Sequence, residues 1–259
     1  MNKYTIINDN FNSPFIISLP HSGTYIPENI KKKFNDNLIL FNSDWFLPEL
    51  YDFLLDTDIT MIINNLNRYV IDVNRKIERR DTRNYRTSLV FHKTAYGKVI
   101  YKHDLSRKDI EERIKFYYEP YHQALNALIQ HKLKIFKKVY LLDLHSYYLP
   151  QEKTNKILIS NNNGLASSKE TFNSICSVFQ DSDLEILRNK IFLGGYITKY
   201  YSKKYKNKVE CIQIELPYNL YIEDRAFGEE EIHFYNEDLF NELKVKLKNI
   251  FINLQQIFN

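Results

Sequence analysis

Short apolar runs alternate along this chain with longer segments of helical periodicity, and this alternation limits the possible folds more than any other feature. Each run is rich in Ile, Val, Leu or Tyr and has the length of a buried strand. Strands that alternate with helices indicate an α/β sandwich with a mostly parallel or mixed sheet. The expected strands are Phe15 to Leu19, Thr60 to Ile63, Val139 to Leu144, Lys156 to Ser160 and Val209 to Leu216.

Two longer segments have the periodicity of amphipathic helices. The clearer one begins near Ser106, where Asp109 completes a pattern like a capping box and apolar residues follow at steps of three and four. Pro120 is expected to kink this helix. The second segment runs from Glu229 to Phe258 and should pack its apolar stripe on the sheet.

The size and composition of the chain fit one domain, which we expect to span residues 1–259. Its 44% hydrophobic and 26% charged residues are an ordinary globular balance and exclude a disordered chain. The stretch from Arg75 to His103 has no clear period, so we expect a polar loop that covers an active site or is plain surface. The arginines within this loop are Arg79, Arg80, Arg83 and Arg86.

The charge and cysteine content exclude several classes of function. The net charge of +4 is small, and the basic runs are short and separated, so we expect solvated faces and no nucleic-acid partner. Cys176 and Cys211 form neither a disulfide framework nor a paired zinc motif, which fits a reducing compartment. The chain has no signal-peptide pattern and no run near the ~20 apolar residues of a membrane span. We expect a cytoplasmic protein without a membrane partner; the oligomeric state stays open.

Polar residues end three of the expected strands, and sites in α/β sheets form at the carboxyl ends of strands. His21 follows the first strand, His145 follows the third, and Glu215 follows the run Cys211 to Ile214 within the last strand. A histidine held by a rigid strand is a natural zinc ligand, and Asp143, on the same face as His145, can fix its tautomer. A purely structural role for each histidine is the alternative.

Two further sets of polar residues are candidates for the same site. Asp44 is the best third metal ligand by position, although it is equally typical of a helix N-cap. Asn74 and Arg75 suit an anionic substrate, because the planar guanidinium of arginine matches a carboxylate. Arg68 is placed to polarise a scissile carbonyl. Ordinary salt bridges at the surface are the alternative for these arginines.

The order and spacing of several motifs resemble the N-formylglutamate amidohydrolase family across most of the chain. The motifs are Leu19-Pro20-His21-Ser22-Gly23, Ser43-Asp44, Arg68 with Asp72-Val73-Asn74-Arg75, Tyr118-Glu119-Pro120-Tyr121-His122, Leu142-Asp143-Leu144-His145-Ser146, Gly194-Gly195-Tyr196-Ile197 and Gln213-Ile214-Glu215 followed by Leu220-Tyr221. The resemblance implies a three-layer α/β/α fold like that of zinc exopeptidases, shared with carboxypeptidases, succinylglutamate desuccinylases and aspartoacylases.

The resemblance also implies roles for the metal-binding candidates. That wider group binds zinc through a His-x-x-Glu pair and a later histidine, and His21 and His145 look like the two histidines. This chain departs from the pattern because the residue three after His21 is Thr24 and not glutamate. We therefore expect Asp44 to replace the glutamate as a ligand of Zn²⁺ or another divalent metal.

By the same resemblance, Glu215 looks like the general base and Arg68 like the arginine that polarises the carbonyl. Asn74 and Arg75 look like the pair that binds a substrate carboxylate. Three residues are weaker substrate-binding candidates: Gly195, Tyr196 and His122. Gly195 is equally typical of a plain turn, and His122 lies on the long helix, where it can simply hydrogen-bond a loop.

The resemblance implies a zinc-dependent amidohydrolase acting on a small, acidic N-acyl amino acid. The leading reaction is hydrolysis of N-formyl-L-glutamate to formate and L-glutamate. Two alternatives stay open, namely a hydrolase of the same fold for another N-acyl amino acid or a short peptide, and a metal-free binding protein. A serine hydrolase is disfavoured, because the chain has no Gly-x-Ser-x-Gly elbow.

Overall fold

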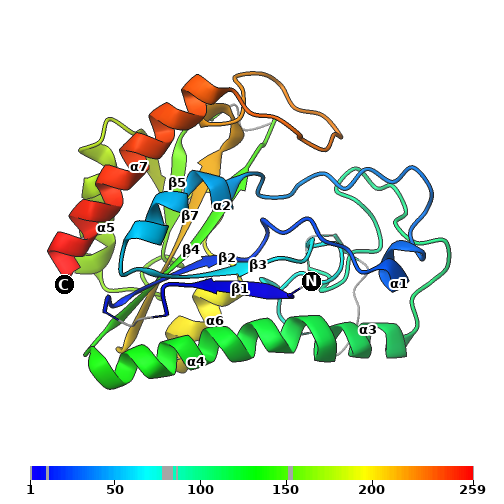
Figure 1. Cartoon of the computed structure of the whole chain (residues 1–259), viewed down its shortest axis with the longest axis horizontal. Coiled ribbons are helices and arrows are strands. Elements are labelled where there is room, and N and C mark those ends of the chain that lie inside the picture. The colour runs from blue at the N-terminus through cyan, green and yellow to red at the C-terminus, as the bar shows by residue number, and fades with distance from the viewer. Residues whose placement is uncertain (1, 10–11, 78–83, 86, 151–153, 259) are drawn as a thin grey trace.

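A seven-stranded sheet forms the centre of the computed structural model, which describes residues 2–9, 12–77, 84–85, 87–150 and 154–258 (Figure 1). The strands are β1 (Tyr4–Ile7), β2 (Phe15–Leu19), β3 (Thr60–Asn64), β4 (Val139–Tyr147), β5 (Ile157–Ser160), β6 (Ile186–Arg188) and β7 (Val209–Pro217). Their order across the sheet is β1-β3-β2-β4-β7-β5-β6. The pairs β1–β3 and β5–β7 are antiparallel and the other pairs are parallel, which confirms the predicted mixed, mostly parallel sheet.

Helices cover both faces of the sheet, so the molecule has the three layers that were expected (Figure 1). The short α2 (Leu47–Leu50), α5 (Lys169–Gln180) and α7 (Glu237–Phe258) cover one face, and α4 (Glu119–Ile135) and α6 (Tyr196–Lys204) cover the other. Each face has its own apolar core, because successive side chains of a strand point to opposite faces. Phe15 and Ile17 of β2 lie in the core beneath α5 and α7, whereas Ile16 lies in the core beneath α4.

The five expected strands are all present, and β4 extends well beyond its predicted end at Leu144. It continues to Tyr147, so His145 lies within a paired strand and not beyond its end, whereas Glu215 lies inside β7 as the predicted bounds had it. The sequence pattern missed β1 and β6, which are short edge strands with half-buried side chains. Edge strands lack the continuous apolar run by which the central strands were recognised.

The long helix predicted from Ser106 is present in three parts. The capping box is confirmed: Asp109 N donates to Ser106 Oγ over 3.1 Å, and Ser106 N donates to the Asp109 carboxylate over 3.0 Å. The first part, α3 (Arg107–Arg113), passes through a π-helical turn (Ile114–Tyr118) into α4. The irregularity therefore precedes Pro120, which lies in the first turn of α4, where its missing N–H is tolerated.

The C-terminal helix begins later than predicted. The expected segment started at Glu229, but α7 begins at Glu237, and the eight residues before it are not helical. Asn236 explains the start, because its side-chain oxygen accepts a hydrogen bond from Leu239 N over 3.1 Å. Ile232 is still buried against the same core, so the apolar pattern was correct about burial and wrong about helix.

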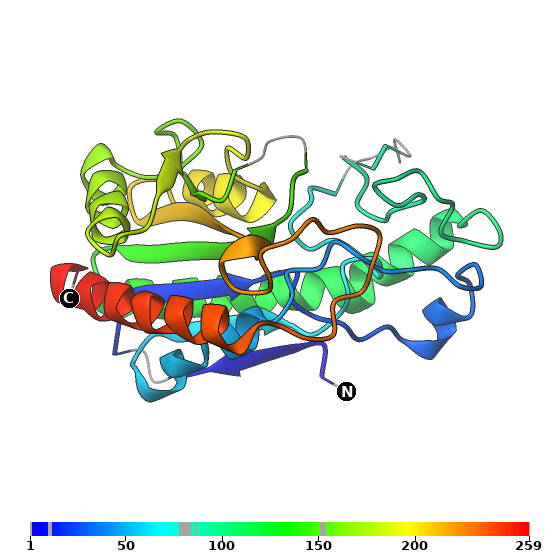
Figure 2. The same cartoon turned by 90° about the horizontal axis from the view of Figure 1, so that it is seen from above.

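Long connecting segments gather at the end of the molecule toward which β2 and β4 point, on the right of Figure 2. The described part of the stretch from 75 to 103 contains neither helix nor extended strand, which agrees with the predicted loop. Arg79, Arg80, Arg83 and Arg86 lie outside the described residues. None of the helices in the described ranges combines the length and apolarity that a membrane crossing requires.

Candidate metal centre

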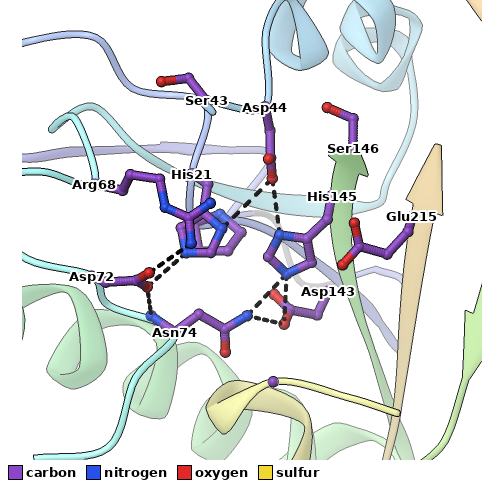
Figure 3. A network of polar contacts seen from close by, with 12 residues as sticks. His21, Ser43, Asp44, Arg68, Asp72, Asn74, Asp143, His145, Ser146 and Glu215 are labelled. Carbon is purple, nitrogen blue, oxygen red and sulfur yellow. Dashed lines mark hydrogen bonds and ion pairs between the residues drawn. The ribbon is translucent and has the colours of Figure 1, made fainter. Parts of the chain in front are cut away.

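Three side chains that were predicted as metal ligands meet at the carboxyl edge of the sheet. His21 follows β2, Asp44 lies in the loop before α2, and His145 lies on β4. All three are buried, and one potential ligand atom from each lies within 4.8 Å of the others. Asp44 Oδ2 is 2.9 Å from His145 Nδ1 and 3.8 Å from His21 Nδ1 (Figure 3). Two imidazoles and one carboxylate from separate segments therefore converge on one point.

Backbone contacts hold Asp44 in this position. Asp44 N donates to His21 O over 3.1 Å, which ties the loop to the end of β2. The alternative interpretation of Asp44 as a helix N-cap is wrong, because the N-cap of α2 is Phe46, which makes no side-chain capping bond. The Asp44 carboxylate does not cap this helix and points toward the two histidines (Figure 3).

The ring of His21 is oriented by Asp72, whose Oδ1 lies 2.7 Å from His21 Nε2. Arg68 donates to the other oxygen of Asp72 over 2.8 Å. Burial alone would raise the pKa of Asp72, but the charges of His21 and Arg68 hold that pKa well below its usual range. An ionised Asp72 accepts a hydrogen bond from His21 Nε2–H, so Nδ1 is left facing Asp44.

The ring of His145 is oriented in the same way by Asp143, whose Oδ2 lies 3.1 Å from His145 Nε2. Ser18 donates to the other oxygen of Asp143 over 2.8 Å, across the parallel pairing of β2 with β4. Burial opposes a charged His145, but the carboxylates of Asp143 and Asp44 raise the pKa of His145 well above its usual value. Both histidines thus present Nδ1 to Asp44.

Acidic side chains outnumber arginines among the described residues of this centre. Four acidic side chains and two arginines leave a formal excess of two negative charges when all are ionised. Buried charges are costly unless paired, so such a group favours a bound cation. The acidic residues are Asp44, Asp72, Asp143 and Glu215, and the arginines are Arg68 and Arg75.

Glu215 lies beside His145, because the two residues are paired in register across β7 and β4. Gln213 donates to the Glu215 carboxylate over 2.8 Å. Burial raises the pKa of Glu215 to about 8, with a further contribution from the charge of Asp44, against the opposing charge of His145. A buried carboxyl group with a raised pKa next to a possible metal site is typical of a general acid or base.

Two arginines are paired with Asp72, the carboxylate beside His21. Arg68 is largely buried and also donates to Asn42 O over 3.2 Å. Arg75 Nε lies 3.6 Å from the Asp72 carboxylate, and its side chain is about twice as exposed as that of Arg68. Both guanidinium groups lie over the ring of Phe91. The alternative of surface salt bridges is therefore wrong for Arg68, whose ion pair is buried, and Arg75 has more access to a ligand.

The structure places Asn74 within the wall of the site. Its side-chain Nδ2 donates to Asp143 Oδ2 over 2.9 Å, and its Oδ1 accepts from Ile197 N over 2.7 Å. Both ends of the carboxamide are therefore used inside the protein. Gly195 is the N-cap of α6, and Gly195 N donates to the side-chain oxygen of Gln213.

His122 and Tyr196 lie on the α4 and α6 side of the sheet. His122 Nε2 is 2.8 Å from Val73 O and Nδ1 is 3.0 Å from the hydroxyl of Tyr201, so the side chain does bond a neighbouring segment, as the alternative foresaw. The ring of Tyr196 stacks on Tyr200 and meets the edge of His122.

Two polar residues of the network were not identified from the sequence. Gln213 contacts Glu215, and Ser18 contacts Asp143. Gln213 stands two residues before Glu215, just as Asp143 stands two residues before His145. Residues spaced by two share one face of a strand, so this spacing was an available signal. The role of Ser18 depends on strand pairing, which a single sequence does not give.

The fold and this buried group define a protein of α/β/α architecture with a candidate metal centre at the carboxyl edge of its sheet. The chain belongs to the N-formylglutamate amidohydrolase family, whose family model matches residues 13–222. It is 27% identical to an N-formylglutamate deformylase of Pseudomonas putida over 92% of this chain and 90% of that protein. It is 24% identical to an N-formylglutamate deformylase of Pseudomonas aeruginosa over 82% of this chain and 84% of that protein.

A solved structure has the same fold along its whole length. The crystal structure of an N-formylglutamate amidohydrolase from Ralstonia eutropha JMP134 matches with a TM-score of 0.81 at 18% identity. The match covers 100% of this chain and 98% of that chain. The resemblance inferred from the motifs is thereby confirmed for the family and for the fold.

Proposed function

We propose that this protein hydrolyses the formyl amide of N-formyl-L-glutamate to formate and L-glutamate, with a divalent metal at His21, Asp44 and His145. The observation that carries the proposal is the convergence of these three ligand atoms within 4.8 Å, with both histidines oriented by carboxylates. Family membership and the names of the two Pseudomonas relatives support the reaction.

The donor set fits zinc best among common metals. Imidazole and carboxylate are zinc ligands, and three protein ligands with a fourth position open are usual in catalytic zinc sites. The carboxylate partners on both histidines are also typical of zinc enzymes. When bound, such a metal supplies a Lewis acid that lowers the pKa of water toward ~7 and polarises a carbonyl.

The protein's own groups carry the proton transfers. Glu215 accepts a proton from the attacking water as the water oxygen bonds to the formyl carbon. Glu215 later gives that proton to the leaving amine as the C–N bond breaks. Arg68 lies across the cluster from Glu215 and donates hydrogen bonds to the oxygen that becomes negative (Figure 3). The net reaction consumes one water and gives formate and the protonated amino group of glutamate.

Arg75 is the described group best suited to hold a substrate carboxylate. Its guanidinium is more exposed than that of Arg68, and it lies over Phe91 next to Asp72. Asn74 and Arg75 were expected to act as a pair, but the Asn74 carboxamide is occupied by Asp143 and Ile197 N. Tyr196, Gly195 and His122 then belong to the supporting wall on the α6 side.

The first prediction concerns the substrate. Loss of one partner of a desolvated, charged hydrogen bond commonly costs ~2–5 kcal/mol, so Arg75→Ala should lower kcat/KM for N-formylglutamate by at least about tenfold. The loss should be much smaller on the mono-amide of N-formylglutamate in which the carboxylate held by Arg75 is amidated. Both mono-amides are tested, because either carboxylate can be the one that Arg75 holds. Formate release is measured for the wild type and for each variant. Arg107→Ala, which changes an exposed arginine on α3, is the matched control.

The same substrate panel separates the alternatives. Equal rates for N-formylglutamate and N-formylleucine would contradict an acidic substrate and favour another acyl amino acid. Binding of N-formylglutamate without formate release, in the presence of added zinc, would instead make the protein a binding protein.

A further inference from the structure

Asn74 contacts both of the carboxylates that orient the two histidines. Its backbone N–H donates to Asp72 Oδ1 over 2.9 Å, and this is the oxygen that lies 2.7 Å from His21. Its side-chain Nδ2 donates to Asp143 Oδ2 over 2.9 Å, and this is the oxygen that lies 3.1 Å from His145. One residue therefore links the supports of both histidines of the proposed metal site.

The orientation of the Asn74 carboxamide is determined by α6. The side-chain Oδ1 and Nδ2 are told apart by their hydrogen bonds. Ile197 N–H can only donate, and it lies 2.7 Å from Oδ1, so the NH₂ group must face Asp143 and His145. Asp143 Oδ2 then accepts a hydrogen bond from Asn74 Nδ2 and lies 3.1 Å from His145 Nε2, which Asn74 Nδ2 also contacts over 2.9 Å. This arrangement leaves Nδ1 of His145 for Asp44.

Gly195 makes room for this carboxamide. The backbone of Gly195 has φ −77° and ψ −167°, which any residue adopts, so the glycine is not needed for its conformational freedom. A Cβ at this position would lie 2.5 Å from both Nδ2 and Oδ1 of Asn74. Contacts this short do not occur, so any other residue at position 195 would displace the Asn74 side chain.

We propose that Asn74 is a positioning residue for the metal centre, held by the first turn of α6, and that Gly195 is required because Asn74 occupies the space beside it. This role differs from the expected ones, which were binding of a substrate carboxylate for Asn74 and substrate binding for Gly195. The proposal rests on the proposed metal-dependent function.

The test is the Kd for zinc in the absence of substrate, measured by competition with a chromogenic chelator. Changes to groups that orient metal ligands usually weaken metal binding by about 10- to 100-fold, so Asn74→Ala should raise the Kd by that factor. Gly195→Ala should raise it as well, although Asn74 itself is unchanged. Circular dichroism and thermal unfolding check that each variant folds. If Asn74→Ala does not fold, Gly195→Ala alone tests the proposal.

A matched control removes a partly buried hydrogen bond at the opposite end of the sheet. Thr60 begins β3, and its hydroxyl donates to Asn8 O over 2.7 Å. Thr60→Val should lower thermal stability and leave the Kd for zinc unchanged. A change in the Kd for zinc in this control would mean that general destabilisation accounts for the loss, which would overturn the proposal.

The outcomes separate this proposal from the function on which it rests. A wild-type protein that binds no zinc contradicts the proposed function itself. If the wild type binds zinc and Asn74→Ala has the same Kd for zinc but a higher KM for N-formylglutamate, Asn74 contacts the substrate. That result would overturn the positioning role. The proposal predicts instead that, at saturating zinc, Asn74→Ala has a lower kcat and a KM close to that of the wild type.

Discussion

At the scale of single residues, the proposed general base depends on its surroundings for its charge. Burial raises the pKa of Glu215 to about 8 in the metal-free protein, so the carboxyl group is mostly protonated at pH 7. A divalent cation beside it would favour the ionised form, because opposite charges lower the pKa of a carboxyl group. Glu215 would then accept protons only when the metal is bound.

Replacing Glu215 by glutamine should separate catalysis from metal binding. Glu215→Gln keeps the shape of the side chain but removes its basic oxygen, so turnover of N-formylglutamate should fall by about 10²- to 10⁴-fold. Zinc content and the affinity for substrate should stay close to those of the wild type. Steady-state kinetics together with metal analysis measure both properties in one preparation.

A matched control is available on the same strand. Glu210 lies at the other end of β7, where it pairs with Lys138, so Glu210→Gln should leave turnover unchanged. Loss of zinc from Glu215→Gln would make Glu215 a metal ligand, and full turnover in that variant would exclude it as the base.

The residue-scale predictions from sequence were most accurate where the sheet brings residues together. His21, Asp44 and His145 were predicted as one group, and their ligand atoms do converge. The contacts of Asn74 could not be predicted in the same way. Its partner Ile197 is 123 positions away in the sequence. The packing of α6 brings Ile197 beside Asn74, and no local sequence pattern shows that packing.

At the scale of elements, α4 and α6 support the segment that carries Asp72 and Asn74. His122 of α4 bonds Val73 O through Nε2 and the hydroxyl of Tyr201, on α6, through Nδ1. Burial lowers the pKa of His122 to about 4, although its hydrogen bond to Val73 partly opposes the shift. The folded protein therefore holds this histidine neutral in a junction between two helices and the site.

This junction predicts a dependence of stability on pH. The pKa of His122 is lower in the folded state than the ordinary value of ~6.5 in an unfolded chain, so protonation favours unfolding. Its contribution is complete above pH ~6.5 and is lost as the pH falls toward 4. His122→Gln lacks this titration, so its free energy of unfolding should fall less steeply than that of the wild type over this range.

Denaturant unfolding of the metal-free proteins at a series of pH values measures this difference. His103→Gln is the control, because His103 is exposed, and its curve should run parallel to that of the wild type. A curve for His122→Gln that is also parallel to the wild type would show that His122 does not contribute to the acid sensitivity.

Element boundaries show where sequence patterns succeed and fail. The central strands were predicted because both of their faces are buried, which gives continuous apolar runs. The end of β4 was not, because His145 is polar and yet remains paired within the sheet. Functional polar side chains interrupt the apolar pattern of a strand, so a strand end predicted too early lies next to the site.

At the scale of the whole molecule, the sheet, the two helical layers and the connecting loops concentrate charge at one end. The parallel strands β2 and β4 deliver His21 and His145 to the same edge, and the loop before α2 adds Asp44. The described groups around them carry more acidic than basic side chains, which a bound cation would balance. The central claim is therefore that this edge of the sheet is a metal site.

The most direct test of this claim is the metal content of purified wild-type protein and of His145→Ala, measured by mass spectrometry after dialysis. The wild type should retain about one divalent ion per chain, with zinc preferred, and His145→Ala should retain almost none, because two remaining ligands bind zinc weakly. Equal metal content in the two proteins, or no metal in either after incubation with zinc, would contradict the account.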